Sequence, residues 1–144
     1  MTAMCFVDTN VLVYANDWQL PHKQALAFDA IAELLEQERL VLSVQVLNEF
    51  AATLLKPRFG YALDEVREAL GVYLRSPLIP MDEALTLRAL DARERYQISL
   101  WDGLIVAAAE RGRCAEILTE DLNHGQEYFG VRARNPFLSA VSER

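Results

Sequence analysis

Short apolar runs alternate along this chain with longer segments of helical periodicity, and this alternation is the feature that most restricts the fold. Residues 4–7 form a continuous apolar run, as expected of a strand buried on both faces. Further short strand candidates are residues 40–42, 78–79, 116–119 and 131–133. Strands that are separated by helices pair in parallel through crossover connections. The sequence therefore predicts an α/β fold, a three-layer α/β/α sandwich whose central parallel sheet has about four or five strands.

The longer segments carry signals for the start and the end of helices. Pro21, Ser43 and Ser99 stand where helices commonly begin, and Gly112 stands where the last one ends. We expect helices over residues 10–16, 22–38, 44–56, 64–75, 82–96 and 99–112.

Length and charge narrow the class of protein. With 144 residues the chain has the usual size of one domain, so we expect a single domain over residues 1–144. A net charge of −7 argues against broad, charge-driven binding of nucleic acid, although an enzyme whose metal ions supply the positive charge stays possible.

The apolar runs and the cysteines indicate the cellular compartment of the protein. The longest apolar run, residues 104–109, is too short to span a bilayer, and the N-terminus lacks the charged start of a signal peptide. Cys5 and Cys114 lie inside apolar stretches and have no neighbours of a metal-binding type, so they read as small core residues. We therefore expect a cytoplasmic protein without a membrane segment.

Two aspartates follow predicted strands, where ligands bind in open parallel sheets. Asp8 comes directly after residues 4–7, and Asp121 comes two residues after Thr119. If the two strands are close in the sheet, both carboxylates face one crevice. The alternative for Asp8 is that it merely caps the following helix, as aspartate often does at such turns.

Two further acidic residues lie on predicted helices. Asp102 belongs to a helix that is apolar on nearly every side and is therefore buried, although its carboxylate also fits a capping box with Ser99. Glu49 stands at the margin of an apolar helix stripe, where a glutamate is usually just solvated.

A metal site in one shared crevice would explain why these four acids stand at such positions. Carboxylates that repel one another need a compensating cation, and Mg²⁺ or Mn²⁺ prefers carboxylate oxygens. His22 and His124 lie far apart in the sequence, and neither stands in a spacing typical of zinc. The sequence also contains neither a serine nucleophile motif nor a glycine-rich phosphate loop.

Several sequence blocks resemble one known family. They are FVDTNVLVYA at residues 6–15, QVLNEF at 45–50, WDGLIVAAA at 101–109, ILTEDLNHGQ at 117–126 and VRARNPF at 131–137. In this order they resemble PIN-domain nucleases, particularly the toxin-type, VapC-like endoribonucleases of prokaryotic toxin–antitoxin pairs. The blocks span nearly the whole chain, but residues 56–96 carry no family signature.

The resemblance implies a fold, a site and an activity. It implies a three-layer α/β/α sandwich and places Asp8, Glu49, Asp102 and Asp121 on the metal-site acids of the family. It places Thr9, Asn10 and Thr119 on polar positions that support the site. The activity implied is hydrolysis of RNA phosphodiester bonds with one or two Mg²⁺ or Mn²⁺ ions. The partners implied are a small antitoxin, encoded by the adjacent gene, and a second copy of the chain in a homodimer.

Basic residues are the candidates for contact with the RNA backbone. Lys56 and Arg58 follow the helix of Glu49, and Arg132 and Arg134 share one face of the last strand. The alternative for all of them is ordinary solvation.

Two other classes of function compete with a nuclease. One is a receiver-type regulatory domain, which also gathers acids around Mg²⁺ but needs paired acids after its first strand and a lysine after a late one. The other is an inactive PIN-like module that uses the acidic crevice to bind a basic partner.

Overall fold

The computed structural model describes residues 3–138, and their centre is a mainly parallel sheet. Within this range the sheet has six strands in the order β3-β2-β1-β4-β6-β5. The strands are β1 (Met4–Val7), β2 (Leu40–Ser43), β3 (Leu78–Ile79), β4 (Cys114–Leu118), β5 (Glu127–Tyr128) and β6 (Val131–Arg134). All neighbours pair in parallel except β5, which runs antiparallel to β6.

The strand β5 corrects the sequence prediction, which gave four or five strands and was too low. This strand has only two residues, too few to show a periodic pattern. It folds back on β6 through Phe129 and Gly130, which both have positive φ angles of 51° and 82°. Positive φ at both central positions is typical of a tight hairpin turn, and Gly130 adopts it without steric cost.

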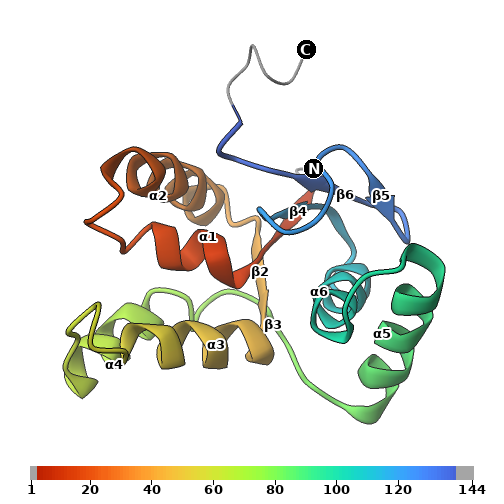
Figure 1. The fold of residues 1–144 in the computed structure, drawn as a ribbon, viewed down its shortest axis with the longest axis horizontal. Helices are drawn as coiled ribbons and strands as arrows, with labels where there is room; N and C mark the ends of the chain where they lie inside the picture. Colours follow the sequence, from red (N-terminus) through yellow and green to blue (C-terminus); the bar gives the residue numbers. More distant parts are fainter. Residues whose placement is uncertain (1–2, 139–144) are drawn as a thin grey trace.

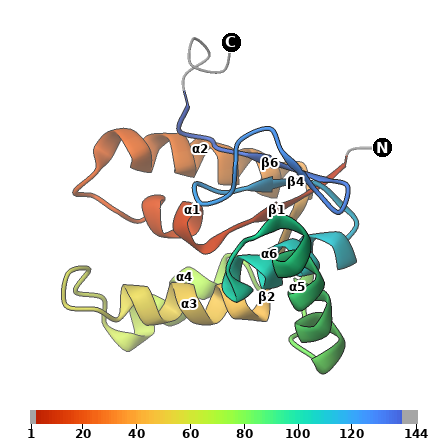
Figure 2. The ribbon, with the colours of Figure 1, turned by 45° about the vertical axis from the view of Figure 1, so that its right-hand side comes forward.

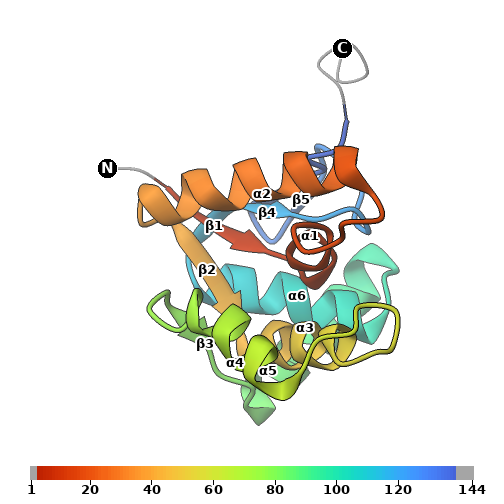
Figure 3. The same cartoon turned by 90° about the vertical axis from the view of Figure 1, so that its left-hand side faces the viewer.

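Helices cover both faces of the sheet, as the sequence predicts. They are α1 (Thr9–Tyr14), α2 (Pro21–Glu36), α3 (Val44–Leu54), α4 (Leu63–Gly71), α5 (Glu83–Tyr96) and α6 (Leu100–Arg111). Figure 1 shows α1 to α4 on one side of the strands and α5 and α6 on the other. The pair α5 and α6 comes forward in Figure 2, and Figure 3 shows α2 running along the top of the molecule above β1, with α1 at the end of that strand.

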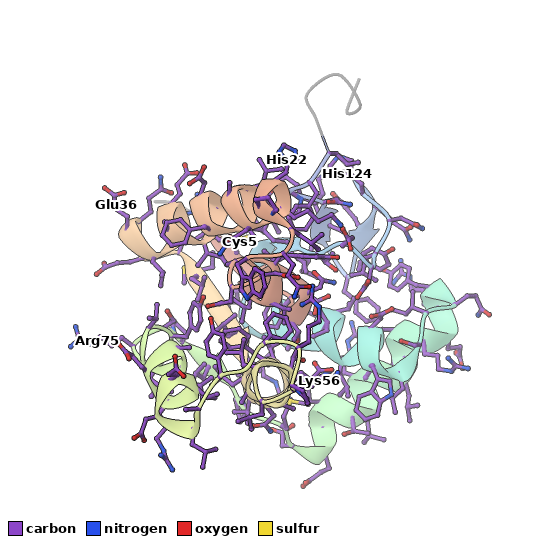
Figure 4. All side chains as sticks on the ribbon, turned by 60° about the vertical axis from the view of Figure 1, so that its left-hand side comes forward. Cys5, His22, Glu36, Lys56, Arg75 and His124 are labelled. Carbon is purple, nitrogen blue, oxygen red and sulfur yellow. The ribbon has the colours of Figure 1, made fainter. Side chains whose placement is uncertain are left out.

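The core lies between the sheet and these helices. Cys5, Phe6 and Val7 of the central strand β1 are fully buried, and so are Ile117 and Leu118 of its neighbour β4. Cys5, labelled in Figure 4, and Cys114 are both buried and free, which confirms that they are core residues. None of the helices within residues 3–138 is long and apolar enough to cross a membrane.

The pairing of β1 with β4 brings the ends of two strands together. Val7 is in register with Leu118, and the backbone N–H of Asp8 donates to the Leu118 carbonyl at 2.9 Å. The helix α3 starts directly after β2, the other neighbour of β1. Asp8, the start of α3 and the segment after Leu118 therefore meet at one edge of the sheet.

A glycine allows the close packing of α5 against α6. A Cβ atom added to Gly103 would lie 2.5 Å from the backbone carbonyl oxygen of Ala89, closer than real Cβ atoms come to backbone. Because Ala89 is itself fully buried in α5, this contact lies in the packed core, where a change of one methyl group is felt. Gly103 therefore fixes the distance at which α6, with Asp102 in its first turn, lies against α5.

This packing predicts that Gly103→Ala lowers the stability of the fold by about 1–3 kcal/mol, the usual cost of overpacking a core. Gly71→Ala is the matched control, because a Cβ atom there meets no atom of residues 3–138 within 4 Å. The control variant should be neutral or slightly more stable, since alanine favours helix over glycine. Urea unfolding of both variants measures the difference, and equal midpoints would contradict the packing argument.

Candidate active site

A cavity of about 460 Å³ opens at the edge of the sheet where β1 and β4 end. Its lining contains all the acidic residues that the sequence singled out. The lining residues are Asp8, Thr9, Asn10, Val13, Tyr14, Gln45, Glu49, Thr53, Trp101, Asp102, Ile105 and Asp121. These residues come from α1 and its preceding turn, from α3, from α6 and from the segment after β4.

Asp8 lies deepest among the acids, and hydrogen bonds fix its carboxylate. It is only 5% exposed. It accepts from the backbone N–H of Thr9 at 2.7 Å and from the Thr119 hydroxyl at 2.8 Å. The Thr119 hydroxyl also accepts from the backbone N–H of Asp121 at 3.1 Å. Asp8 thus caps α1, as the simpler interpretation held, and at the same time faces the cavity.

The next two residues of α1 each hold another acid. The Thr9 hydroxyl donates to Glu49 Oε1 at 3.0 Å. The Asn10 side-chain amide donates to Asp121 Oδ2 at 2.9 Å. The first turn of α1 therefore joins α3 on one side to the segment after β4 on the other. Glu49 and Asp121 themselves are exposed, so the cavity has a buried acid at its base and solvated acids at its rim.

Asp102 enters the cavity from the opposite face of the sheet. It stands in the first turn of α6, where Ser99 caps the helix and accepts from the Asp102 backbone N–H at 3.0 Å. Its side chain is half-buried. Partial burial and the nearby Asp121 carboxylate raise the pKa of Asp102 above its ordinary value. The first turn of α6 thus contains the N-cap hydrogen bond of Ser99 and also presents the Asp102 carboxylate to the cavity.

Burial has its strongest electrostatic effect on Asp8. Removal of the carboxylate from water, together with smaller contributions from the Asp121 and Asp102 charges, raises the pKa of Asp8 from 3.8 to about 7. The hydrogen bonds from Thr119 and Thr9 act in the other direction. A cation near these acids would stabilise their charged forms, because an opposite charge lowers the pKa of a carboxyl group.

The donor atoms of the cavity fit a hard divalent cation. Among residues 3–138 neither histidine nor cysteine lines it, and its charged groups are all carboxylates. Two buried oxygens there, Asn10 Oδ1 and Gln45 Oε1, lack a hydrogen-bond donor among residues 3–138. In the described range no three acidic, histidine or cysteine side chains converge into a ready metal cage. Mg²⁺ typically takes one or two carboxylates and keeps several waters, so an open arrangement suits it.

Comparison with protein families agrees with this geometry. A model of the PIN domain matches residues 5–126, which include all the acids of the cavity. The chain belongs to the PIN-domain family. This assignment confirms the resemblance that the sequence blocks indicate, and it sets aside the receiver-type alternative.

Solved structures show the same fold. The crystal structure of FitAcB from Neisseria gonorrhoeae is similar to this PIN domain, with a TM-score of 0.67 and 24% sequence identity. The match covers 93% of this chain and 99% of the other. At this level of identity the likeness concerns the fold alone. A search of curated proteins finds no match to the sequence.

The predicted site residues of the PIN domain divide into two groups. The residues of the first group meet at the cavity. All of them line it except Thr119, which donates a hydrogen bond to Asp8 there. This group contains Asp8, Thr9, Asn10, Glu49, Asp102, Thr119 and Asp121. The second group contains the basic residues Lys56, Arg58, Arg132 and Arg134, which do not line the cavity.

Most of these basic residues have acidic partners elsewhere. Arg58 binds the carboxylate of the buried Asp17 at 2.8 Å. Arg132 pairs with Glu127 at 2.7 Å on the neighbouring strand. The remaining arginine of β6, Arg134, pairs with Glu116 of β4, and Lys56 is exposed just after α3, as Figure 4 shows.

Some residues of the site escaped the sequence analysis. Gln45 lies one helical turn before Glu49 and donates to its Oε1 at 3.3 Å. The i, i+4 spacing of these residues was the signal that could have found it. The hydroxyl of Tyr14 donates to Glu120 at 2.7 Å, and Lys23 forms an ion pair with the same carboxylate. This contact anchors the residue before Asp121 to α1 and α2.

The burial of Asp8 predicts a pH-dependent stability in metal-free buffer. Between about pH 4 and 7 the folded state keeps a proton on Asp8 that the unfolded chain has released, so the free energy of unfolding falls as the pH rises. Asp8→Asn cannot ionise and should raise the Tm by about 3 °C or more at pH 8, with a smaller gain near pH 5.5. Thermal unfolding in EDTA measures both values.

The exposed aspartate Asp29 of α2 supplies the control for this experiment. Asp29→Asn should change the Tm little and equally at both pH values. A gain for Asp8→Asn that does not grow between these pH values would show that the Asp8 carboxylate is not the group responsible.

Proposed function

We propose that this PIN domain is an endoribonuclease that hydrolyses RNA phosphodiester bonds with Mg²⁺ or Mn²⁺, as the toxin of a toxin–antitoxin pair. The observation that supports it most is the meeting of four acids from separate segments, Asp8, Glu49, Asp102 and Asp121, in one cavity. Membership of the PIN-domain family adds support, because PIN domains are generally nucleases that use divalent cations.

In this proposal the four acids hold one or two divalent cations. Asp8 and Asp102 contribute the more buried carboxylates, and Glu49 and Asp121 contribute exposed ones. A bound cation of this type lowers the pKa of water and neutralises charge on a phosphate oxygen.

The polar residues of the chain keep these carboxylates in place. The Thr119 hydroxyl donates to Asp8 Oδ2, and the Thr9 backbone N–H donates to Asp8 Oδ1. Asn10 fixes one oxygen of Asp121 in the same way. Neutral donors serve this purpose well, because they orient the carboxylates without cancelling the charge that attracts a cation. Thr9, Asn10 and Thr119 are therefore positioning residues.

The decisive experiment is cleavage of total RNA with Mg²⁺ or Mn²⁺. Asp8→Asn and Asp102→Asn should each lower the rate by about a hundredfold or more, because each removes a ligand charge while the fold is kept. EDTA should abolish cleavage, and Zn²⁺ should not be required. The rate of RNA loss, with sequencing of the new ends, measures the effect and identifies the bonds that are cut.

Asp29→Asn, which changes an exposed aspartate of α2, is the matched control and should keep full activity. Full cleavage by both cavity variants would overturn the shared metal site. A protein that cleaves no RNA but binds a basic partner tightly would instead be the inactive PIN-like module.

The proposal includes a small antitoxin, encoded by the adjacent gene, as the inhibitory partner. A cavity that gathers carboxylates attracts an arginine or lysine side chain, which would replace the charge of the cation and block access of phosphate. A groove between α2 and α4, lined by Phe28, Ile31, Leu35, Val72 and Tyr73 among others, offers apolar contact for an amphipathic segment.

Two finer parts of the proposal concern assembly and location. We expect a homodimer, as is usual for toxin-type relatives. We also expect the protein to work in the cytoplasm, because Cys5 and Cys114 are both free thiols in the core.

The toxin role predicts that expression of this chain alone slows bacterial growth. Co-expression of the adjacent open reading frame should restore growth, and its product should be recovered with the chain in a pull-down. Asp8→Asn should be harmless but should still bind that product through the apolar groove. If the wild type is harmless and no neighbouring product binds it, the toxin role fails, whereas the nuclease activity is judged by the cleavage assay.

A further inference from the structure

A second cavity opens beside the acidic one and shares part of its wall. Its volume is about 480 Å³, and it is lined by Gln45, Asn48, Glu49, Met81 and Trp101. Gln45, Glu49 and Trp101 line both cavities. A molecule bound at the acids can therefore extend into this neighbouring cavity, which we call the side pocket.

Trp101 is the aromatic residue that lines both cavities. It precedes Asp102 in the first turn of α6, and it is 63% exposed. Met81, the other large apolar residue of the side pocket, is 39% exposed. Exposed aromatic surface next to a polar site is suited to stacking against a planar group, because it needs no rearrangement of the protein.

The charges of both cavities limit how a polyanion can bind. Neither lining, within the described residues 3–138, contains a lysine or an arginine. Attraction to phosphate near the acids then depends on the cation, and further affinity has to come from uncharged groups of the ligand. In a nucleic acid these groups are the bases, which stack on aromatic side chains when they are unpaired.

Amide groups supply polar contacts in the side pocket. Gln45 is only 8% exposed, and its Oε1 is a buried acceptor without a donor in the described chain. Its amide nitrogen donates a hydrogen bond to Glu49. Asn48 adds an exposed amide one turn further along the same helix. Donors and acceptors of this kind match the edges of a base that is not paired with another strand.

We propose that Trp101 is the stacking platform for an unpaired nucleobase next to the phosphate at the acidic cavity, with Gln45 and Asn48 at the edge of that base. This inference rests on the proposed ribonuclease function, and it adds which residues of this chain hold the base beside the cut. A base inside a duplex is stacked and paired, so it cannot enter the side pocket without being extruded.

Kinetics on single-stranded RNA test the platform. Trp101→Ala and Trp101→Leu should raise KM about tenfold or more, since both lose the aromatic face, whereas Trp101→Phe should stay close to the wild type. Trp18→Ala is the matched control, because Trp18 is 64% exposed but lines neither cavity. An unchanged KM for Trp101→Leu would overturn the proposal.

A binding experiment separates this inference from the proposed activity. The sequence has two tryptophans, so Trp18→Phe leaves Trp101 as the sole indole fluorophore. In Ca²⁺, which replaces Mg²⁺ to slow hydrolysis, a single-stranded RNA decamer should quench this fluorescence, and the same RNA as a duplex should not. The readout does not depend on turnover, so it tests the platform even if the protein cleaves no RNA.

Two outcomes of this titration contradict the proposal. Equal quenching by the duplex would show that the side pocket does not require an unpaired base. The absence of quenching by either RNA would assign the exposed indole to another class of ligand, such as a protein side chain.

Discussion

The burial of a carboxylate among other carboxylates at the end of β1 is the constraint to which the rest of the site is adapted. Burial disfavours the ionised form of Asp8 there, and the charges of Asp121 and Asp102 add to this effect. The chain offsets part of this cost with neutral donors, the Thr119 hydroxyl and the Thr9 backbone amide, and leaves the remaining charge uncompensated. Arginine is used elsewhere, where Arg58 neutralises the buried Asp17. The fold thus keeps a concentrated negative charge at the cavity while it neutralises buried charge outside it.

The first turn of α6 combines three requirements in consecutive residues. Successive residues of a helix point in directions about 100° apart, so neighbours in sequence serve different surroundings. Trp101 faces solvent and both cavities, Asp102 faces the acids, and Gly103 allows the approach to α5. Because α6 is buried along most of its length, the position of these residues is set by core packing and not by the cavity itself. A change in the α5–α6 contact therefore moves the acid and the indole together.

Much of the fold followed from local sequence signals, and the contacts of the site did not. The apolar runs predicted the parallel strands. The acids that directly follow strands predicted a common site at one edge of the sheet. Both predictions depend only on residues that are neighbours along the chain. The hydrogen bond from Thr9 to Glu49 joins residues 40 positions apart, and that from Asn10 to Asp121 joins residues 111 apart. Such pairs depend on side-chain geometry across the sheet, which periodicity does not encode. The partners of Arg132 and Arg134 were missed for the same reason, although their common strand face was predicted.

Both outer strands of the sheet, β3 and β5, have only two residues. A long bare strand at a rim offers unpaired backbone groups on which another chain can add, and this route leads to ribbons and fibrils. Here each rim exposes very little backbone, so growth of the sheet from one molecule into the next is disfavoured. A second copy of the chain therefore finds little backbone on which to extend the sheet, which favours contact through helix surfaces over strand addition.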